Sequence, residues 1–333
     1  MIQFLGIDFS CGSVTAACIG RDLTLTRERS TPIQNVRRDP SGARARVSPA
    51  EWVRAASYLT QEIYLDLPVS LRKFWGVGLS STSGWVALDL DYAPLGDVNL
   101  VPADEITAEF RAWIEREPRM EKRISVILSP KDYFRFAVTG SLACDVTLAS
   151  RQGLLAESDS VSPTWDKQLI ADARLEPRWL PPVFDCEVVT GQISPPGIER
   201  TGLPGGLRFV AGGLSECCSH VASGDFRSRK LWAPADTGRL LYTVPEPPQV
   251  VPAGFQLTRS AYTGHWLLER HVGPDTALGD GIDGAIGDLG AAGLPVEDVV
   301  RETRRAALGA AALAAVGSGL IRSWDDFYRK VKW

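Results

Sequence analysis

The sequence is poor in histidine and methionine and has no paired-cysteine motif. Only three of its 333 residues are histidine and two are methionine, and its six cysteines form no C-x-x-C pair. A disulfide framework, a structural zinc site and Ser-His-Asp chemistry therefore have little material. We expect reduced thiols in a cytoplasmic protein, with the adjacent Cys217 and Cys218 as small buried hydrophobic residues.

Long apolar runs and a secretory leader are also missing. The longest uncharged stretch, Ala306–Ile321, is rich in alanine and glycine and is shorter than the ~20 residues that cross a bilayer. The N-terminus has no basic segment and carries an acid at Asp8, unlike a signal peptide. The sequence therefore predicts a closely packed helix near its end and no membrane anchor.

No strong excess of charge of either sign is present. Lys and Arg number 36 against 40 Asp and Glu, a net charge of −4, so the basic footprint of a nucleic-acid binder is absent. Hydrophobic residues make up 44% of the chain, as in ordinary globular proteins. The length favours two domains. We expect the partner to be a small molecule or another protein.

The N-terminal half alternates strand patterns with two well-marked helices. Phe4–Asp8 and Val14–Ile19 predict a hairpin, and Trp75–Ser80 with Trp85–Asp89 repeats the pattern of strand, polar turn and strand. Ser48, followed by Pro49, predicts the start of a helix with one apolar stripe. A second helix is predicted over 131–138, ending at Gly140.

The C-terminal half is less regular. Prolines recur through 158–206, which predicts loops and short helices. We further expect a strand, turn and helix over 208–223, a strand pair over 232–244, a loosely organised connection over 273–293, and a terminal helix pair over 296–317 and 323–331.

Six stretches in order resemble the FGGY family of carbohydrate kinases. They are Gly6–Ser13; Gly78–Leu95 with its Thr-Ser-Gly turn at Thr82, Ser83 and Gly84; Pro130–Leu154; Leu180–Val183; Gly202–Gly213; and the Ala-Leu-Gly-Ala-Ala helix at Ala307–Gly317. The turn is similar to that of the branch that includes ribulokinase-like and xylulokinase-like proteins.

The resemblance implies an α/β protein with the actin-like (ribonuclease H-like) ATPase fold. It implies an N-terminal sugar-kinase domain over 1–210 and a reduced, truncated C-terminal domain over 211–333. In an active member the cofactors would be ATP and Mg²⁺, and the substrate would be a sugar or polyol such as a ketopentose.

The resemblance also assigns roles to residues. Ser10, Cys11, Gly12 and Ser13 take the place of the first phosphate loop, and Asp236, Thr237 and Gly238 that of the second. Thr82, Ser83 and Gly84 take a substrate-binding place. Asp8 keeps the family position near the phosphates, where it would orient magnesium or water. A turn-stabilising aspartate is an equal alternative.

The family's catalytic base is an aspartate that accepts the proton of the sugar hydroxyl. Alignment on Val210–Leu214 puts Ser215 at this position, and a serine hydroxyl stays protonated near neutral pH. Glu216 follows one residue later, and a neighbouring helical position points about 100° away. Either Glu216 replaces the base, or it is a solvated or capping residue.

Other departures affect both ligand sites. Cys11 replaces the usual threonine, and Asp236 would face polyphosphate with like charge. The family's Trp-x-Asp-x-Arg segment for the sugar is absent after Leu95, and its glycine-rich adenosine segment is absent before Ala306. Compared with the family that it resembles, the chain is short, and the missing stretches coincide with the sugar-contact and adenosine-contact segments.

Three hypotheses follow. We favour a pseudokinase that keeps the scaffold and binds a sugar-like metabolite or a protein partner without phosphotransfer. The second is an active kinase with a divergent site that uses Glu216 or Asp236 as its base. The third is a different chemistry in the same interdomain cleft, which would involve Cys217, Glu216 or His220. Each of the three hypotheses is compatible with a homodimer.

Overall fold

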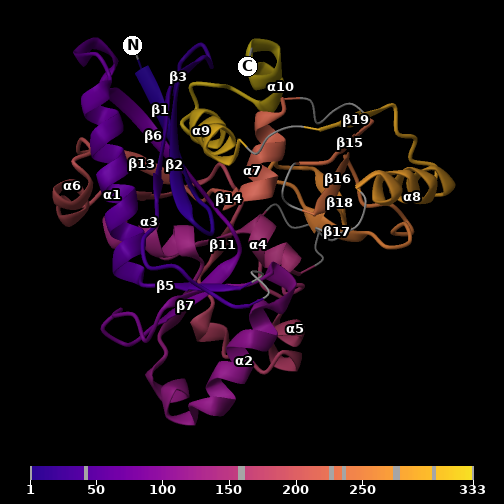
Figure 1. Ribbon diagram of the computed structural model, residues 1–333, viewed down its shortest axis with the longest axis horizontal. Coiled ribbons are helices and arrows are strands. Elements are labelled where there is room, and N and C mark those ends of the chain that lie inside the picture. The colour runs from indigo at the N-terminus through magenta and orange to yellow at the C-terminus, as the bar shows by residue number, and fades with distance from the viewer. Residues whose placement is uncertain are drawn as a thin grey trace.

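The structure is a computed structural model that describes residues 2–40, 44–156, 162–224, 229–234, 238–272, 278–301 and 305–331. A large sheet lies at one end, a smaller sheet with short helices lies below it, and a third sheet lies to the side (Figure 1). This mixed α/β arrangement confirms the fold class expected from the sequence. The division at residue 210 stays a prediction.

The large sheet has the strand order β12-β13-β6-β1-β2-β3, and β14 pairs with the end of β6. Among the three N-terminal strands, β2 (Ser13–Gly20) is antiparallel to both β1 (Ile2–Phe9) and β3 (Leu25–Pro32), so the expected first hairpin is confirmed. The other members are β6 (Lys73–Ser81), β12 (Val189–Gln192), β13 (Arg208–Val210) and β14 (Gly213–Leu214). β13, β14 and β1 all run parallel to β6.

Alternation along β1 separates two hydrophobic cores. Leu5, Ile7 and Phe9 pack with Trp52 of helix α1 (Pro49–Asp66) and Phe134 of helix α3 (Pro130–Thr139). Phe4 belongs to the core that contains helices α7 (Ser215–Ala222) and α9 (Ala306–Gly317). Because side chains alternate along a strand, Asp8 lies on the α9 face of the sheet with Gly6.

The two predicted N-terminal helices are confirmed, with different caps. α1 begins at Pro49 after Ser48, but the Ser48 side chain makes no capping hydrogen bond. In α3 the Ser129 hydroxyl accepts a hydrogen bond from the Asp132 amide, and Gly140 ends the helix at φ 74°. Left-handed backbone of this kind favours glycine.

The smaller sheet corrects the expected second hairpin. β6 and β7 (Gly84–Leu88) follow one another in the chain but do not pair, because β6 aligns with β1 while β7 joins the order β4-β5-β8-β7-β9. The other strands are β4 (Arg37–Arg38), β5 (Ala45–Val47), β8 (Val98–Leu100) and β9 (Val126–Leu128). Helix α2 (Ile106–Arg116) packs against β7 through Phe110 and Trp85.

Short elements connect this region to the rest, as expected for the proline-rich segment. They are β10 (Cys144–Asp145), α4 (Val146–Arg151), α5 (Lys167–Asp172), β11 (Val183–Phe184) and α6 (Pro195–Thr201), with single 3-10 turns at Val69–Leu71, Ala103–Glu105, Pro118–Arg123 and Pro177–Trp179. Residues 157–161 lie outside the described part.

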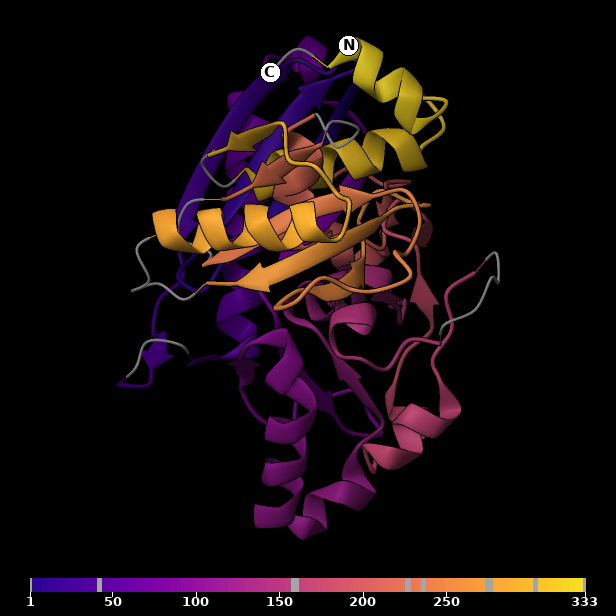
Figure 2. The same cartoon turned by 90° about the vertical axis from the view of Figure 1, so that its right-hand side faces the viewer.

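The third sheet has the order β17-β18-β16-β15-β19. Its strands are β15 (Lys230–Trp232), β16 (Arg239–Val244), β17 (Gln256–Arg259), β18 (Trp266–His271) and β19 (Asp298–Val300). β15 and β16 are antiparallel, which confirms the predicted strand pair. Figure 2 shows helix α8 (Leu278–Ala291) lying across this sheet.

Two expectations for this half were wrong. Residues 278–291 are a helix rather than a loose connection, because Ile282, Ala285 and Leu289 form a buried stripe against the sheet. The penultimate helix begins at Ala306, since 298–300 form strand β19. The last helix is α10 (Trp324–Lys330), capped by Ser323. No helix in the described ranges is long and apolar enough to span a membrane.

Helix α9 approaches its neighbours too closely for side chains at three glycines. An added Cβ at Gly6 would lie 1.8 Å from the Ala307 carbonyl oxygen, and one at Gly78 1.8 Å from that of Ala310. On α9 itself, a Cβ at Gly309 would lie 1.7 Å from the Cys218 carbonyl oxygen. The alanine and glycine content of α9 therefore reflects close packing against β1, β6 and α7.

Gly78→Ala should lower the free energy of unfolding by ~3 kcal/mol or more, because backbone must move to admit the methyl group. Gly287→Ala is the matched control. Position 287 lies in α8 with no atom within 4 Å of the added Cβ, so alanine should stabilise the helix by up to ~1 kcal/mol. Urea unfolding of both variants measures the two effects, and equal effects would contradict the packing described.

The five buried cysteines predict a loss of stability at alkaline pH. Burial raises the pKa of Cys18 to about 12 and raises those of Cys144, Cys186, Cys217 and Cys218 well above the ordinary value. The unfolded chain releases these protons first. The stabilisation is therefore complete below the unfolded pKa of ~8.5 and is lost as pH rises, by up to ~1.4 kcal/mol per pH unit for each thiol.

Urea unfolding under reducing conditions at neutral and alkaline pH measures this loss. Cys218→Ala removes one of the five thiols and should flatten the dependence. A free energy of unfolding that stays level or rises above pH 9 would contradict the prediction.

Candidate functional site

The carboxylate of Asp8 accepts hydrogen bonds from three serines. Asp8 lies near the end of β1 and is only 4% exposed. Its Oδ1 accepts from the hydroxyls of Ser80 at 2.8 Å and Ser215 at 2.5 Å, and its Oδ2 accepts from Ser10 at 3.2 Å. Three segments distant in sequence therefore meet at one carboxylate.

The sheet and one glycine turn position these groups. Asp8 is directly opposite Ser80 in the parallel pairing of β1 with β6. Ser215 is the first residue of α7, which follows the turn at Gly212 with φ 76°. A Cβ at Gly212 would lie 1.9 Å from the Leu79 carbonyl oxygen, so the turn can lie against β6 only with glycine there.

Glu216 points to a second group of charges. Its Oε1 lies 2.5 Å from Nη1 of Arg151 and 3.8 Å from Nε of Arg239, and its side chain is 15% exposed. Arg151 also pairs with Glu269 of β18 at 2.5 Å, and Thr258 of β17 donates to Glu269 at 2.8 Å. The candidate base is therefore one part of a largely buried ionic network.

This network joins the third sheet to the centre of the molecule. Arg151 ends α4 and is 3% exposed, while Glu269 and Arg239 come from β18 and β16. Burial by itself lowers the pKa of Arg151, but Glu269 and Glu216 outweigh burial and hold that pKa well above its ordinary value. The guanidinium is therefore charged and forms ion pairs with both carboxylates.

The predicted first phosphate loop is a tight turn beside the Thr82–Gly84 connection. Within it, the Ser10 amide donates to the Ser13 carbonyl at 2.9 Å. The half-buried Cys11 is contacted by Arg38, whose Nη1 lies 2.9 Å from its Sγ, and Gly12 leads to β2. The Thr82 amide donates to the Phe9 carbonyl at 2.9 Å.

The other predicted ligand-binding residues are placed in part. Ser83 donates its hydroxyl to the Val101 carbonyl at 2.6 Å, and Gly84 begins β7. In the predicted second loop, Gly238 has φ 60° and precedes β16. Asp236 and Thr237 lie outside the described residues.

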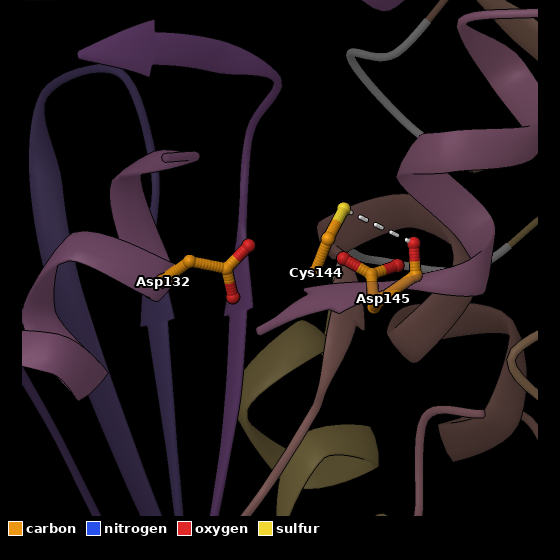
Figure 3. Close-up of side chains that lie close together, drawn as sticks. All are labelled: Asp132, Cys144 and Asp145. Atoms are coloured by element: carbon orange, nitrogen blue, oxygen red, sulfur yellow. Dashed lines mark hydrogen bonds between the residues drawn. The ribbon is translucent and has the colours of Figure 1, made fainter. Parts of the chain in front are cut away.

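The described residues contain one group that has the composition of a metal site. Asp132, Cys144 and Asp145 have their ligand atoms within 4.8 Å of one another (Figure 3). Lys131 fills the role of a cation there, because its Nζ lies 2.6 Å from Asp132 Oδ1 and 2.9 Å from Asp145 Oδ2. Arg135 adds a second positive charge 3.0 Å from Asp132. These acids are balanced by the protein's own cations.

Sequence reasoning missed three of the residues at the centre. Ser80 gave no signal, since a serine at the end of a strand reads as the start of a turn. Arg151 lies inside the family-like stretch Pro130–Leu154, but the sequence gives no sign of its ion pairs. The contact of Arg38 with Cys11 depends on how the strands pair, which the sequence does not show. The roles predicted for Asp8, Ser215 and Glu216 are untested by these positions and stay predictions.

Comparison with known proteins finds similarity to one family over part of the chain. A model of the FGGY family of carbohydrate kinases, N-terminal domain, matches residues 105–221. This match contains Arg151, Ser215 and Glu216, and it agrees with the motifs on both sides of it. Residues 105–221 are therefore similar to this family.

Curated relatives match this chain over a limited part of their length. Xylulose kinase of Bacillus subtilis is 26% identical over 40% of this chain and 26% of its own, and a probable L-xylulose kinase of Pasteurella multocida is 36% identical over 30% and 21%. The matched part thus spans about a quarter of each relative.

Solved structures match much more of the chain. The xylulose kinase of Rhodospirillum rubrum has a TM-score of 0.81 at 17% identity and covers 97% of this chain and 92% of its own. Glycerol kinase of Plasmodium falciparum, solved with ADP, has a TM-score of 0.75 at 14% identity, covering 99% and 92%. The chain therefore has the same fold as these two structures, the actin-like ATPase fold.

Arg151→Met should lower the free energy of unfolding by ~3–5 kcal/mol, because Glu269 and Glu216 would lose a buried partner. The matched control is Arg29→Met, which removes an exposed pair with Asp66 and should cost a small fraction of that loss. Urea unfolding compares the two. Similar losses would show that the buried network carries no special weight.

Proposed function

We propose that this protein is a homologue of the FGGY carbohydrate kinases that binds a sugar or polyol in its interdomain cleft and carries out little or no ATP-dependent phosphotransfer. One observation carries the proposal: both predicted catalytic carboxylates are engaged by groups of the protein itself. Asp8 is held by three serines and Glu216 by arginines.

A general base needs an oxygen that is free to accept the substrate's proton. The pairing of Glu216 with Arg151 and Arg239 favours the charged carboxylate and weakens it as a proton acceptor. Ser215 offers no substitute, since its hydroxyl donates to Asp8. Transfer through either residue would require a rearrangement of buried polar contacts.

The geometry at Asp8 does not fit direct magnesium binding. Mg²⁺ requires an octahedral shell at short distance and usually keeps several waters, whereas Asp8 is 4% exposed and accepts from Ser10, Ser80 and Ser215. Asp8 also belongs to no group of three ligand-bearing acidic, cysteine or histidine residues within the described ranges. We therefore interpret the Asp8 carboxylate as a structural anchor rather than as a magnesium ligand.

An active kinase of a ketopentose or polyol is the second candidate, with ATP and Mg²⁺ as cofactors. It is favoured by the family, by xylulose kinases among the relatives, and by the 15% exposure of Glu216 in the first turn of α7. Glu216 would act as base once its ion pairs open.

A different chemistry in the cleft has less support. Burial raises the pKa of Cys217 well above its ordinary value, so this thiol stays protonated and is a poor nucleophile. His220 is buried on the same helix, with Thr243 3.3 Å from its Nε2. A protein partner, a homodimer and a cytoplasmic location stay predictions.

Thermal unfolding and ADP release test the proposal together. A member of a panel of ketopentoses and polyols should raise the melting temperature, because a ligand that binds only the native state stabilises it. ADP release with Mg-ATP and the same compound should stay at the background of a protein-free reaction.

Two variants decide between the candidates. Glu216→Gln should leave ADP release at background if the proposal holds, as should the control Glu62→Gln on helix α1. ADP release well above background that Glu216→Gln abolishes and Glu62→Gln preserves would overturn the proposal in favour of the kinase. The absence of stabilisation by every compound in the panel would overturn the sugar-binding role.

A further inference from the structure

A basic groove lies between the smaller sheet and helix α2. Its larger cavity has a volume of about 420 Å³ and is lined by five arginines and two acidic residues, a net charge of +3. The arginines are Arg37, Arg38, Arg44, Arg46 and Arg116. This local charge contrasts with the net charge of −4 of the whole chain.

Strand register builds one wall of the groove. Arg37 is opposite Arg46, Arg46 is opposite Asn99, and Asn99 is opposite Trp85. Because directly paired residues share a face, these four side chains form one row across β4, β5, β8 and β7. The opposite face of the sheet carries Val47, Val98 and Val86 of the hydrophobic core.

Helix α2 forms the facing wall. Glu109, Trp113 and Arg116 line the cavities at the spacing that places residues on one side of a helix. A second cavity of about 220 Å³ shares Arg46, Asn99, Glu109 and Arg116 with the first and adds the two tryptophans Trp85 and Trp113. The groove is therefore basic at one end and aromatic at the other.

Three of the five arginines have no carboxylate partner among the residues that the structure describes. Arg44 pairs with Glu105 at 2.5 Å and with Glu109, and Arg37 pairs with Asp97. Arg38 donates to the Sγ and the carbonyl oxygen of Cys11, and Arg116 donates to the Ala112 carbonyl. Within the described residues, the Arg46 side chain forms no hydrogen bond or ion pair. Unpaired guanidiniums around a concave site suit an anion that accepts several hydrogen bonds at once.

A polar group at the aromatic end is also unsatisfied. Trp85 is 4% exposed, and its indole Nε1–H finds no acceptor within the described parts of the chain. Its ring lies 5.4 Å from that of Trp113. Buried indole N–H groups usually have a hydrogen-bond partner, and a hydroxyl oxygen of a ligand would supply one.

We propose that this groove binds a phosphate monoester of a small polyhydroxylated molecule, with the phosphate on Arg46, Arg38 and Arg116 and the hydroxylated body against Trp85 and Trp113. The site goes beyond the proposed function, since its lining contains neither Asp8 nor Glu216 nor any of the serines and arginines that bind these two carboxylates. Its recognition combines charge at one end with a ring surface and one N–H donor at the other.

Isothermal titration calorimetry with ribose 5-phosphate, ribose and inorganic phosphate tests the proposal on the full chain. Ribose 5-phosphate should bind most tightly and weaken with added salt, because its phosphate meets exposed charges. Equal affinity for ribose and its phosphate ester would overturn the anion site. Equal affinity for inorganic phosphate and the ester would overturn the contact with the body, and no heat with the ester at millimolar concentration would overturn the proposal as a whole.

Matched variants locate the binding. Arg46→Ala and Arg116→Ala should each weaken the ester roughly tenfold or more, since each removes a charge-assisted contact. Arg29→Ala, which changes an exposed arginine on β3, should leave the affinity unchanged. Trp85→Phe should weaken the ester while leaving inorganic phosphate unaffected. Unchanged affinity in Arg46→Ala and Arg116→Ala would overturn the proposed location.

Two readouts separate this inference from the proposed function. The melting temperatures without ligand check that each variant is folded, which the exposure of Arg46 favours. A neutral sugar that binds in the proposed interdomain cleft should raise the melting temperature of Arg46→Ala by as much as it raises that of the unaltered protein. Failure of neutral sugars to bind would leave the ester experiment, and its outcome, intact.

Discussion

The centre of the molecule depends on the hydrogen bonds that the Asp8 carboxylate accepts. Ser80 and Ser215 both donate to one oxygen, and Ser10 donates to the other. These donors come from the end of β6, the start of α7 and the turn after β1. A single buried acid therefore fixes the relative positions of the end of β6, the predicted catalytic segment at the start of α7 and the predicted first phosphate loop. Satisfied networks of this kind hold a structure in one arrangement.

The same arrangement of internally balanced charge recurs nearby. Arg151 joins α4 to Glu216 and to Glu269 of the third sheet, and Lys131 lies between Asp132 and Asp145. In each case the protein supplies the counter-ion that a ligand or metal would otherwise supply. The actin-like fold is thus present with its central charges directed at one another, which is the physical basis for proposing a binding role.

Local sequence signals predicted the elements whose causes are local. The β1–β2 hairpin, α1 and α3 follow from alternation, proline at the helix start and Gly140 at the helix end. Contacts between segments that are far apart in the sequence were not predicted. β6 joins β1 rather than β7, and α8 forms despite its glycines because Ile282, Ala285 and Leu289 are buried against the third sheet.

In the candidate site, too, the sequence predicted single residues but not the contacts between distant parts of the chain. Asp8, Ser10, Ser215 and Glu216 were found individually from family-like motifs, but the bond between Ser215 and Asp8 joins residues 207 positions apart. Ser80 and Arg151 acquire their roles only through tertiary contacts. The row of Arg37, Arg46, Asn99 and Trp85 depends on strand register, which brings residues that are separate in sequence onto one wall of the groove.

A double-mutant cycle between Asp8 and Ser215 tests the central claim most directly. The free energies of unfolding of Asp8→Asn, Ser215→Ala and the double variant give the coupling between the two side chains. The account predicts a coupling of ~1.5–3 kcal/mol, as for a hydrogen bond to a buried charged group. Additive effects of the two substitutions, with no coupling, would contradict the view that Asp8 serves as the structural anchor of the site.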